Sequence, residues 1–466
     1  MKTGILLRCL LMAEGTQTKI IKVLMLPWLG HGHISPYLEL AKRLSIRNFH
    51  IYFCSTPINL KSIKEKLTQK TNSSSIELVE LHLPSSPELP PHYHTSNGLP
   101  PHLMIHLKKA FELSAAQFSV LLQSLTPDLV IYDFNQPWAA EIASSQAIPA
   151  VEFVIIGAAM VAFGLHLMKN PGEEFPFPEI YLRGYEKRKM LQNQGDKDKI
   201  LQATNHSYKI FLLKSCREIE GKFIDYLSET YDKKFVPLGP LVPEDLTSSN
   251  DDDRDKEIME WLDQKEKSSV VYASFGSEYY LTQQEIVAMS QGLDLSNVNF
   301  IWALRFPVGE EENISIKEVL PDGFLDKIGN RGKIVKGWAP QAKILKHSST
   351  GGFLSHCGWC SVMESLMWGG CGGIPIIGVP MHSDQPVNAR VVEAIGVGVE
   401  AVRDEEGNLL GEEIAKVIRM VMVDDSGAEI RRKAKELGET LVAKGDAEID
   451  NLSIELAQLC STEYSK

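Results

Sequence analysis

The chain of 466 residues is too long for a single hydrophobic core, so two domains of ordinary size are expected. Hydrophobic residues make up 44% and charged residues 23%, which is typical of a soluble globular protein. A formal net charge of −12 argues against nucleic acid or an anionic membrane as the main partner, so local groups must hold any bound anion.

Cysteine content and hydropathy indicate a cytosolic chain. The seven cysteines are an odd number scattered along the sequence, which suits a reducing compartment better than a disulfide framework. No apolar run reaches the roughly 18 residues that a membrane span requires. Residues 1–19 are expected to be an extension, because Arg8 interrupts their apolar stretch and no small-residue cleavage site follows. A monomer is expected.

Strand and helix patterns alternate through the first half of the chain. After the first strand, a Gly/His turn leads into an amphipathic helix over 35–44, with Pro36 near its first turn. This alternation predicts a mainly parallel sheet with right-handed crossovers. Buried-strand patterns cover residues 20–28, 50–55, 76–83, 129–134 and 150–155.

A second alternating series predicts a second domain over 258–445, after a first domain over 20–240. Residues 241–257 between them are polar, acidic and aperiodic, as in a linker. The strand ends of the two domains are expected to form one shared cleft. A C-terminal helix over 446–466 is expected to pack back on the first domain. The second series has strand patterns at 269–276, 299–305, 333–338, 351–355 and 374–379.

Asp251, Asp252 and Asp253 in the linker are of the residue type that binds hard cations. They lie in an aperiodic charged segment without a flanking strand. Solvated linker charge is therefore the favoured interpretation, and no metal site is assigned.

The segment GGFLSHCGWCSVMESL at 351–366 combines an apolar strand, a tight turn and a helix start. Cys357 and Cys360 have the CxxC spacing of a redox pair. With His356 and Cys371 nearby, zinc binding is a second alternative, although no second ligand pair at regular spacing is visible.

The same turn also suits an anion. A glycine-bearing turn from strand to helix directs unpaired backbone N–H groups and the helix dipole at whatever lies before the helix. His356 and Ser361 add side-chain donors at that place. A purely structural alternative is a capping box formed by Ser361 and Glu364.

Residues 338–385 resemble the donor-binding signature of the plant glycosyltransferases that use uridine-diphosphate (UDP) sugars. The signature begins with Trp-Ala-Pro-Gln at 338–341, passes through His-Cys-Gly-Trp at 356–359 and closes on Asp-Gln at 384–385. The resemblance extends over almost the whole chain, from PWLGHGHISP near the first strand to the C-terminal helices. It implies the GT-B fold, an α/β architecture of two Rossmann-like, doubly wound parallel-sheet domains facing across a cleft.

The resemblance also assigns the donor contacts. Trp338 would stack on uracil, and the backbone of Ala339 would hydrogen-bond the edge of that base. Gln341 and Glu364 would bind the ribose hydroxyls. The sugar would be contacted by Trp359, Asp384 and Gln385. The diphosphate would be bound by Ser277, His356, Ser361 and the turn amides around Gly358 and Cys360.

The resemblance assigns His33, in the turn after the first strand, as general base and Asp133 as its partner acid. A carboxylate bonded to the far imidazole nitrogen fixes the tautomer and stabilises the imidazolium as it forms. The implied reaction is an inverting displacement in which His33 takes the acceptor's proton as UDP leaves. Backbone dipoles stabilise the leaving diphosphate, so neither a metal nor another cofactor is expected.

Two features depart from the family pattern. Cys360 stands where the family usually has Asn, which should weaken donor binding. Between Glu364 and Asp384 the chain carries about four more residues than the usual spacing. The extra Gly-rich loop around 370–373 either bulges outward or displaces Asp384 and Gln385.

Stretches such as FCSTPINL at 53–60 and FIWALRFP at 300–307 are similar to the branch that extends sugar chains on flavonoid or terpenoid glycosides. This resemblance implies a glycoside acceptor, glucose as the transferred sugar and a 1→6 or 1→2 linkage. One alternative is an aglycone O-glucosyltransferase. Another is a donor-binding protein whose Gly-rich loop has impaired its activity.

Overall fold

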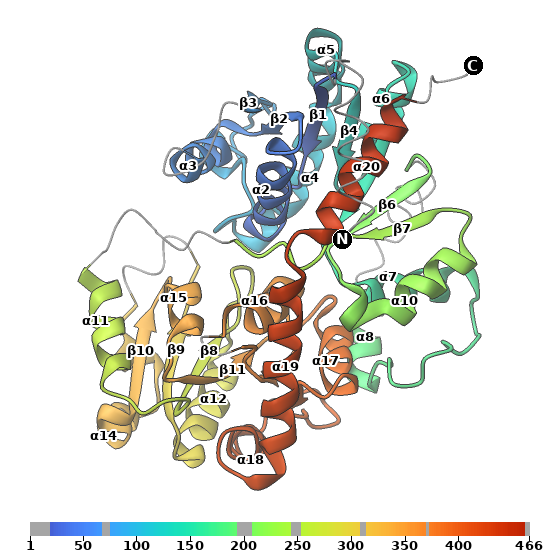
Figure 1. Cartoon of the computed structure of the whole chain (residues 1–466). Coiled ribbons are helices and arrows are strands. Elements are labelled where there is room, and N and C mark those ends of the chain that lie inside the picture. Colours follow the sequence, from blue (N-terminus) through green and yellow to red (C-terminus); the bar gives the residue numbers. More distant parts are fainter. Residues whose placement is uncertain are drawn as a thin grey trace.

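The computed structural model describes residues 19–67, 75–192, 207–243, 253–307, 314–369 and 372–461. It forms two α/β domains, coloured mainly blue to green and yellow to red in Figure 1. Within the described ranges, no helix is both long and apolar enough to cross a membrane. The expected extension over 1–19 lies, apart from residue 19, outside these ranges.

Two parallel sheets organise the described chain, which confirms the prediction of two doubly wound domains. The first sheet has the order β3-β2-β1-β4-β5-β6-β7, and the second has the order β10-β9-β8-β11-β12-β13. The strand order reverses between β1 and β4 in the first sheet and between β8 and β11 in the second. The strands are β1 (Ile21–Leu26), β2 (Phe49–Ser55), β3 (Ile76–Glu80), β4 (Leu129–Tyr132), β5 (Ala150–Val154), β6 (Ile210–Leu213), β7 (Lys234–Pro237), β8 (Val270–Ser274), β9 (Asn299–Leu304), β10 (Gly332–Lys336), β11 (Thr350–Ser355), β12 (Ile376–Gly378) and β13 (Gly398–Glu400).

The strands are apolar on both faces because helices cover both sides of each sheet. All four residues of β4 and all five of β8 are buried. Alternate residues of β1 enter two different cores, with Val23 packing on the side of α2 and Leu24 on the side of α4 and α5. The strands β6, β7 and β13, which have only four, four and three residues, were not predicted.

Most of the helices lie between successive strands, and three α-helices follow β13, the last strand of the described chain (Figure 1). In the first half of the chain they are α2 (His31–Ser45), α3 (Pro57–Leu67), α4 (Met104–Leu113), α5 (Ala115–Leu125), α6 (Pro137–Ser145), α7 (Ala158–Lys169), α8 (Gly184–Gln192) and α10 (Arg217–Thr230). In the second half they are α11 (Asp253–Asp263), α12 (Gln283–Ser296), α13 (Ile316–Val319), α14 (Phe324–Ile328), α15 (Gln341–Lys346), α16 (Trp359–Trp368), α17 (Gln385–Ala394), α18 (Gly411–Met422), α19 (Ala428–Lys444) and α20 (Ala447–Ser461).

Helix α2 begins one turn earlier than the sequence pattern predicts. It starts at His31, so the Gly/His turn becomes its first turn and Pro36 lies inside the helix. Because proline has no N–H, the carbonyl of Gly32 lacks the helix donor four residues further on. The early start places His33 on the first turn, directly beyond β1.

The end of the chain returns to the first domain (Figure 1). Helix α20 buries Ile449, Leu452 and Leu456 in the same core as β1 and α2. Ahead of this helix, Asp446 accepts a hydrogen bond from Arg43 of α2 at 2.6 Å.

The expected linker over 241–257 is shorter than predicted at its C-terminal end. Helix α11 starts at Asp253, where acidic residues in the first turn and a buried stripe of Ile258, Trp261 and Leu262 favour a helix. Asp251 and Asp252 lie outside the described residues.

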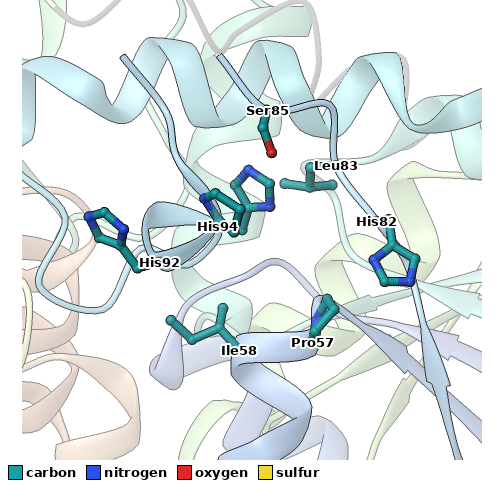
Figure 2. A pocket seen from close by; sticks show the side chains of 8 residues that line it. Pro57, Ile58, His82, Leu83, Ser85, His92 and His94 are labelled. Atoms are coloured by element: carbon teal, nitrogen blue, oxygen red, sulfur yellow. The ribbon is translucent and has the colours of Figure 1, made fainter. Parts of the chain in front are cut away.

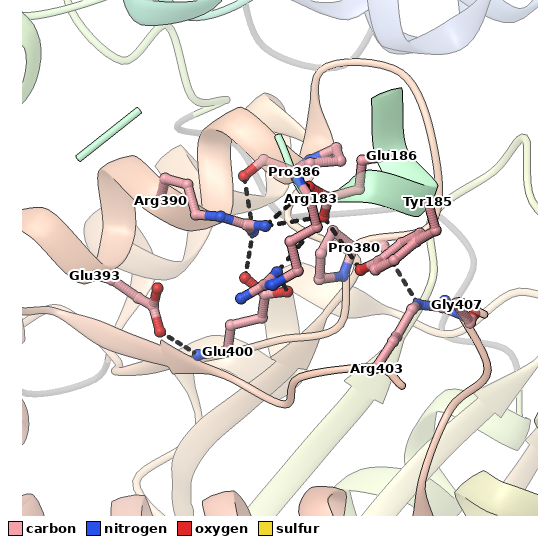
Figure 3. Close-up of polar contacts among 10 residues, drawn as sticks. All are labelled: Arg183, Tyr185, Glu186, Pro380, Pro386, Arg390, Glu393, Glu400, Arg403 and Gly407. Atoms are coloured by element: carbon pink, nitrogen blue, oxygen red, sulfur yellow. Dashed lines mark hydrogen bonds and ion pairs between the residues drawn. The ribbon is translucent and has the colours of Figure 1, made fainter. Parts of the chain in front are cut away.

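A buried ion network joins the two domains (Figure 3). Arg390 of α17 donates to both carboxylate oxygens of Glu186 in α8, at 2.8 and 3.0 Å, and pairs with Glu400 of β13. Arg183, just before α8, donates to Glu400 at 2.5 Å. Arg390 is only 1% exposed, so these charges lie in a low-dielectric interior. Arg390 also donates to the carbonyl of Pro386, which holds the first turn of α17.

We expect Arg390→Met to lower the free energy of unfolding by about 3–5 kcal/mol, because Arg183 alone then compensates the buried carboxylates of Glu186 and Glu400. The matched control is Arg432→Met on α19, where the arginine is half-exposed and pairs with neighbours on the helix surface. The control should change stability little. Urea unfolding followed by circular dichroism measures both variants, and equal losses would contradict a structural role for the network.

Candidate active site

The predicted site residues lie beyond the carboxyl ends of the central strands. In the first domain His33 follows β1 and Asp133 follows β4, the two strands between which the strand order reverses. In the second domain Ser277 follows β8 and His356 follows β11, again at the reversal. Ligands of doubly wound sheets bind at these crevices.

His33 and Asp133 form a hydrogen-bonded pair although they are 100 residues apart in sequence. The Nδ1 atom of His33 lies 2.5 Å from Oδ2 of Asp133, which is fully buried. The other carboxylate oxygen of Asp133 accepts from the backbone and side-chain nitrogens of Asn135, both at 3.1 Å. The carboxylate is therefore fixed, and Nε2 is the imidazole nitrogen left for a substrate.

The electrostatic surroundings of His33 come from both domains. Burial lowers the pKa of His33, but neighbouring carboxylates outweigh this effect and raise it above the ordinary value. Asp133 contributes most through its charge and hydrogen bond, and Glu278 and Asp384 of the second domain add to it. His33 of the first domain therefore faces acidic groups of the second domain.

The turn between β11 and α16 has the geometry of a helix N-terminus. Cys357 adopts a left-handed backbone with φ of 62°, and Gly358 is the N-cap residue without a side-chain capping bond. Ser361 is the third residue of α16, not its N-cap, so the capping-box alternative is wrong. The first-turn amides of α16 thus have no side-chain cap.

The imidazole of His356 packs closely between Gly276 and Gly358. A Cβ at Gly276 would lie 2.6 Å from its Nε2, and a Cβ at Gly358 would lie 2.5 Å from the same atom, so neither position has room for a side chain. Burial lowers the pKa of His356 to about 3, and the ring is therefore neutral. Its Nδ1 is buried without a hydrogen-bond partner among the described residues, which leaves that atom for a ligand.

Cys357 and Cys360 face different partners and do not behave as a redox pair. The sulfur of Cys357 lies near the carbonyl of Ser355 at 3.7 Å, whereas Cys360 Sγ accepts from Lys214 Nζ at 2.9 Å. Burial raises the pKa of both thiols, the opposite of what a reactive thiolate requires. Across the described ranges, no three His, Cys, Asp or Glu side chains are grouped closely enough to hold a metal ion, and Cys371 lies outside those ranges.

Trp338 presents an exposed aromatic surface at the domain boundary. Its side chain is 60% exposed, which is unusual for an indole. The guanidinium of Arg305 lies 5.4 Å from the ring centroid, and His31 of the first domain meets the ring edge-on at 5.8 Å. A planar base can stack on such a platform. The neighbouring Ala339 is buried.

Gln341 and Glu364 lie side by side, as the expected ribose contacts require. Gln341 opens α15 and donates from Nε2 to Glu364 at 2.5 Å. Burial raises the pKa of Glu364 to about 6, while Lys214 and the hydrogen bond from Gln341 act in the opposite direction.

Asp384 and Gln385 lie at the start of α17. Asp384 accepts from Asn388 at 2.8 Å, and burial raises the pKa of its carboxyl. The side-chain oxygen of Gln385 accepts from the backbone amides of Met381 and His382 at 2.9 and 3.0 Å. The amide nitrogen of Gln385 therefore remains the group available to a sugar hydroxyl.

The described residues of the Gly-rich loop, Gly372 and Gly373, precede β12 and lie against α19. The loop connects α16 to the amino end of β12, whereas Asp384 follows the carboxyl end of β12. Gly373 lies close to Ala434 of α19. Residues 370 and 371 are outside the described residues. The neighbours of Gly372 and Gly373 are residues of α16 and α19, not of α17.

Trp359 lies in the domain interface. Its side chain is 3% exposed, packs against Gly157 and donates from the indole nitrogen to the carbonyl of Lys214 at 2.5 Å. This residue joins the donor signature to the first domain, and its expected contact with the sugar stays a prediction.

A cavity of 340 Å³ opens in the first domain beyond β2 and β3 (Figure 2). Pro57 and Ile58 at the start of α3 lie opposite Leu83, Ser85 and His94. The loop that carries His94 continues to residues 95 and 96, which hydrogen-bond to the carbonyl of residue 29 just before α2. The cavity therefore shares a loop with the turn that leads into α2, the helix that carries His33.

Sequence reasoning missed several residues that line this site. Glu278, directly after Ser277, acts electrostatically on His33, and Arg305 follows β9. Lys214 follows the unpredicted strand β6, and a lysine directly after the apolar run IFLL was the signal available in the sequence. Glu278 and Arg305 lie beside stretches that the sequence analysis used, but neither residue was itself assigned a role.

Two family models match the chain. Residues 19–243 match the family described as "Glycosyltransferase, N-terminal domain". Residues 225–430 match the family described as "UDP-glucoronosyl and UDP-glucosyl transferase". The two matches correspond to the two sheets.

Curated relatives match over nearly their full length. The chain is 51% identical over 448 residues to "UDP-glucosyltransferase 29" of Panax ginseng, with 94% of this chain and 97% of that protein covered. It is 48% identical over 443 residues to "Beta-D-glucosyl crocetin beta-1,6-glucosyltransferase" of Gardenia jasminoides, with 93% and 98% covered.

A solved structure supports the fold. A UDP-glucosyltransferase from Polygonum tinctorium capable of glucosylating indoxyl, in complex with 3,4-dichloroaniline, matches with a TM-score of 0.77 and 26% identity, over 96% of this chain and 100% of that one. The expected GT-B fold is thereby confirmed. The chain belongs to the plant family of UDP-sugar-dependent glycosyltransferases and is a UDP-glycosyltransferase.

Proposed function

We propose that this enzyme transfers glucose from UDP-glucose to a sugar hydroxyl of a flavonoid or terpenoid glycoside, with inversion and without a metal ion. The observation that carries the proposal is the His33–Asp133 pair, whose Nδ1 and Oδ2 atoms are 2.5 Å apart. The pair lies where the strand order reverses, and the charge of Asp384 in the donor signature raises the pKa of His33.

In this proposal the donor is held mainly by the second domain. Uracil stacks on Trp338, and ribose bonds to Gln341 and Glu364. The diphosphate lies at the start of α16, where the amides of its first turn, Nδ1 of His356 and the hydroxyl of Ser361 are available. These donors supply the stabilisation that a metal ion gives elsewhere.

The chemical step is a direct displacement. His33 removes the proton of the acceptor hydroxyl through Nε2, and the oxygen forms a bond to the anomeric carbon of glucose. The bond between that carbon and the diphosphate oxygen breaks, and UDP leaves with the bonding electrons. Because attack comes from the face opposite UDP, the configuration inverts. Asp133 stabilises the imidazolium that forms.

The acceptor is assigned to the first domain. The cavity beyond β2 and β3 offers apolar walls from Ile58 and Leu83 and polar groups from Ser85 and His94 (Figure 2), which suits the part of a glycoside remote from the reacting hydroxyl. The name of the Gardenia relative supports a glycoside acceptor. An aglycone acceptor is the alternative.

A donor-binding protein without transfer is the second alternative. The Gly-rich loop precedes the amino end of β12, whereas the site residues Asp384 and Gln385 follow its carboxyl end, and this separation favours an active enzyme. The proposal also places the reaction in the cytosol, supported by the free thiols of the cysteines in the described ranges. A monomer remains the expected state.

We expect His33→Ala to lower kcat/KM by about 100-fold or more, because it removes the base, while leaving the Kd of UDP nearly unchanged. Trp338→Ala should instead weaken UDP binding about tenfold through the lost stacking on uracil. Steady-state rates with UDP-glucose and titration calorimetry with UDP separate these effects. Normal turnover of the His33 variant would remove the proposed mechanism.

The charge of Asp133 should be visible in the pH profile of kcat/KM. Carboxylates raise the pKa of His33, so the base becomes protonated and inactive as the pH falls through this raised value. In Asp133→Asn the main raising charge is absent, so the acid limb should move to lower pH and the maximal rate should fall. An acid limb at an unchanged pH would show that a different group titrates.

Acceptor class and metal independence can be tested together. We expect UDP-glucose to glucosylate flavonoid and terpenoid monoglucosides faster than their aglycones, with the rate unaffected by excess EDTA. Mass spectrometry detects the products, and NMR of the purified disaccharide gives the linkage and the anomeric configuration. Faster reaction with aglycones would favour the alternative acceptor, and loss of activity with EDTA would overturn the metal-free mechanism.

A further inference from the structure

Lys214 is a buried lysine at the boundary between the domains. It follows β6 in the first domain and is 2% exposed. Its Nζ donates to Cys360 Sγ at 2.9 Å, on the first turn of α16 in the second domain. The ammonium group therefore lies beside the helix start to which the donor signature is assigned.

Within the described ranges, the only side-chain acceptor bonded to this ammonium is the thiol of Cys360, which is a weak acceptor. Burial raises the pKa of Cys360 in spite of the opposite effect of Lys214, so the thiol stays neutral. Among the described residues, Lys214 forms no ion pair with a carboxylate, although its charge acts on the buried Glu364. A buried ammonium whose bonded side-chain partner is a neutral thiol is costly, which points to an anionic ligand.

Hydrogen bonds within and between the domains fix the backbone of Lys214 and the thiol of Cys360. The amide of Lys214 donates to Val154 of β5 at 2.9 Å, and its carbonyl accepts from the indole of Trp359 at 2.5 Å. The thiol of Cys360 donates in turn to Gly32 at 3.7 Å, the carbonyl that Pro36 leaves without a helix donor. The ammonium group is therefore held in place before any ligand arrives.

We propose that Lys214 binds the diphosphate of the nucleotide-sugar donor from the first domain, opposite the amides of α16. This inference rests on the proposed function, since it takes the donor to lie at the start of α16. The ammonium supplies local positive charge in a chain whose formal net charge is −12. It also stabilises the negative charge that grows on UDP as the glycosidic bond to phosphate breaks.

Cys360, which stands where the family usually has Asn, agrees with this role of Lys214. The thiol is a poor hydrogen-bond donor to phosphate, but it accepts from Lys214 and so orients a much stronger donor towards the same place. The diphosphate contact expected from residue 360 is thus made by the lysine that this residue holds.

The test compares UDP with uridine, which lacks the phosphates, by titration calorimetry on the full chain. In Lys214→Met we expect the Kd of UDP to rise about tenfold or more through loss of a charged hydrogen bond, while the Kd of uridine stays unchanged. Lys214→Arg should recover part of the UDP affinity. Lys234→Met is the control for net charge, since Lys234 is 61% exposed and pairs with Glu455; it should change neither Kd.

Thermal unfolding separates this role from a structural one. Because the substitution removes an unpaired buried charge, Tm of Lys214→Met without ligand should be equal to or above that of the wild type, and UDP should raise Tm less than in the wild type. Equal UDP affinity in both proteins would overturn the assignment of Lys214 and leave the proposed function intact. Equal weakening of UDP and uridine would also overturn it, and a wild type that bound neither would overturn the proposed function as well.

Discussion

The buried ion network around Arg390 determines how the two halves of the active site meet. Arg390 holds the first turn of α17 through the carbonyl of Pro386, and this turn follows directly on Asp384. The same guanidinium pairs with Glu186 on α8, which precedes the second domain in sequence. Moving α17 away from α8 would separate charges in a low-dielectric interior, which is costly. The ion network thus holds α17, whose N-cap residue is Asp384, against α8.

The same physics explains how an acidic chain can bind a diphosphate. Bulk charge repels an anion, so the site relies on oriented groups that act at short range, where the protein screens little. Helix amides and a neutral imidazole at His356 add no net charge, and Lys214 adds one charge at the interface. The acidic groups Glu278 and Asp384 face His33 instead, where negative charge strengthens a base.

The sequence predicted the elements that follow a local pattern. Long apolar strands and the signature from Trp338 to Gln385 are visible as runs or motifs, whereas the pairing of His33 with Asp133 came from the family resemblance. The predicted start of α2 was wrong because we placed Pro36 in the first turn, where proline is usually found. The helix instead starts earlier and continues through Pro36 with one hydrogen bond missing. Lys214 and the crossing of α8 onto the second domain depend on contacts between distant segments, and no local period encodes such contacts.

Parallel topology also explains why a long Gly-rich insertion is compatible with the site. In a parallel sheet the amino ends of all strands lie on one side and the carboxyl ends on the other. Loops that lead into strands therefore lie on the side opposite to loops that follow strands. The insertion leads into β12 and its described part lies against α19, while Asp384 and Gln385 follow β12 at the edge that faces His33. Three residues of strand separate the two edges. The described part of the insertion therefore packs on α19 at the opposite end of β12 from Asp384 and Gln385.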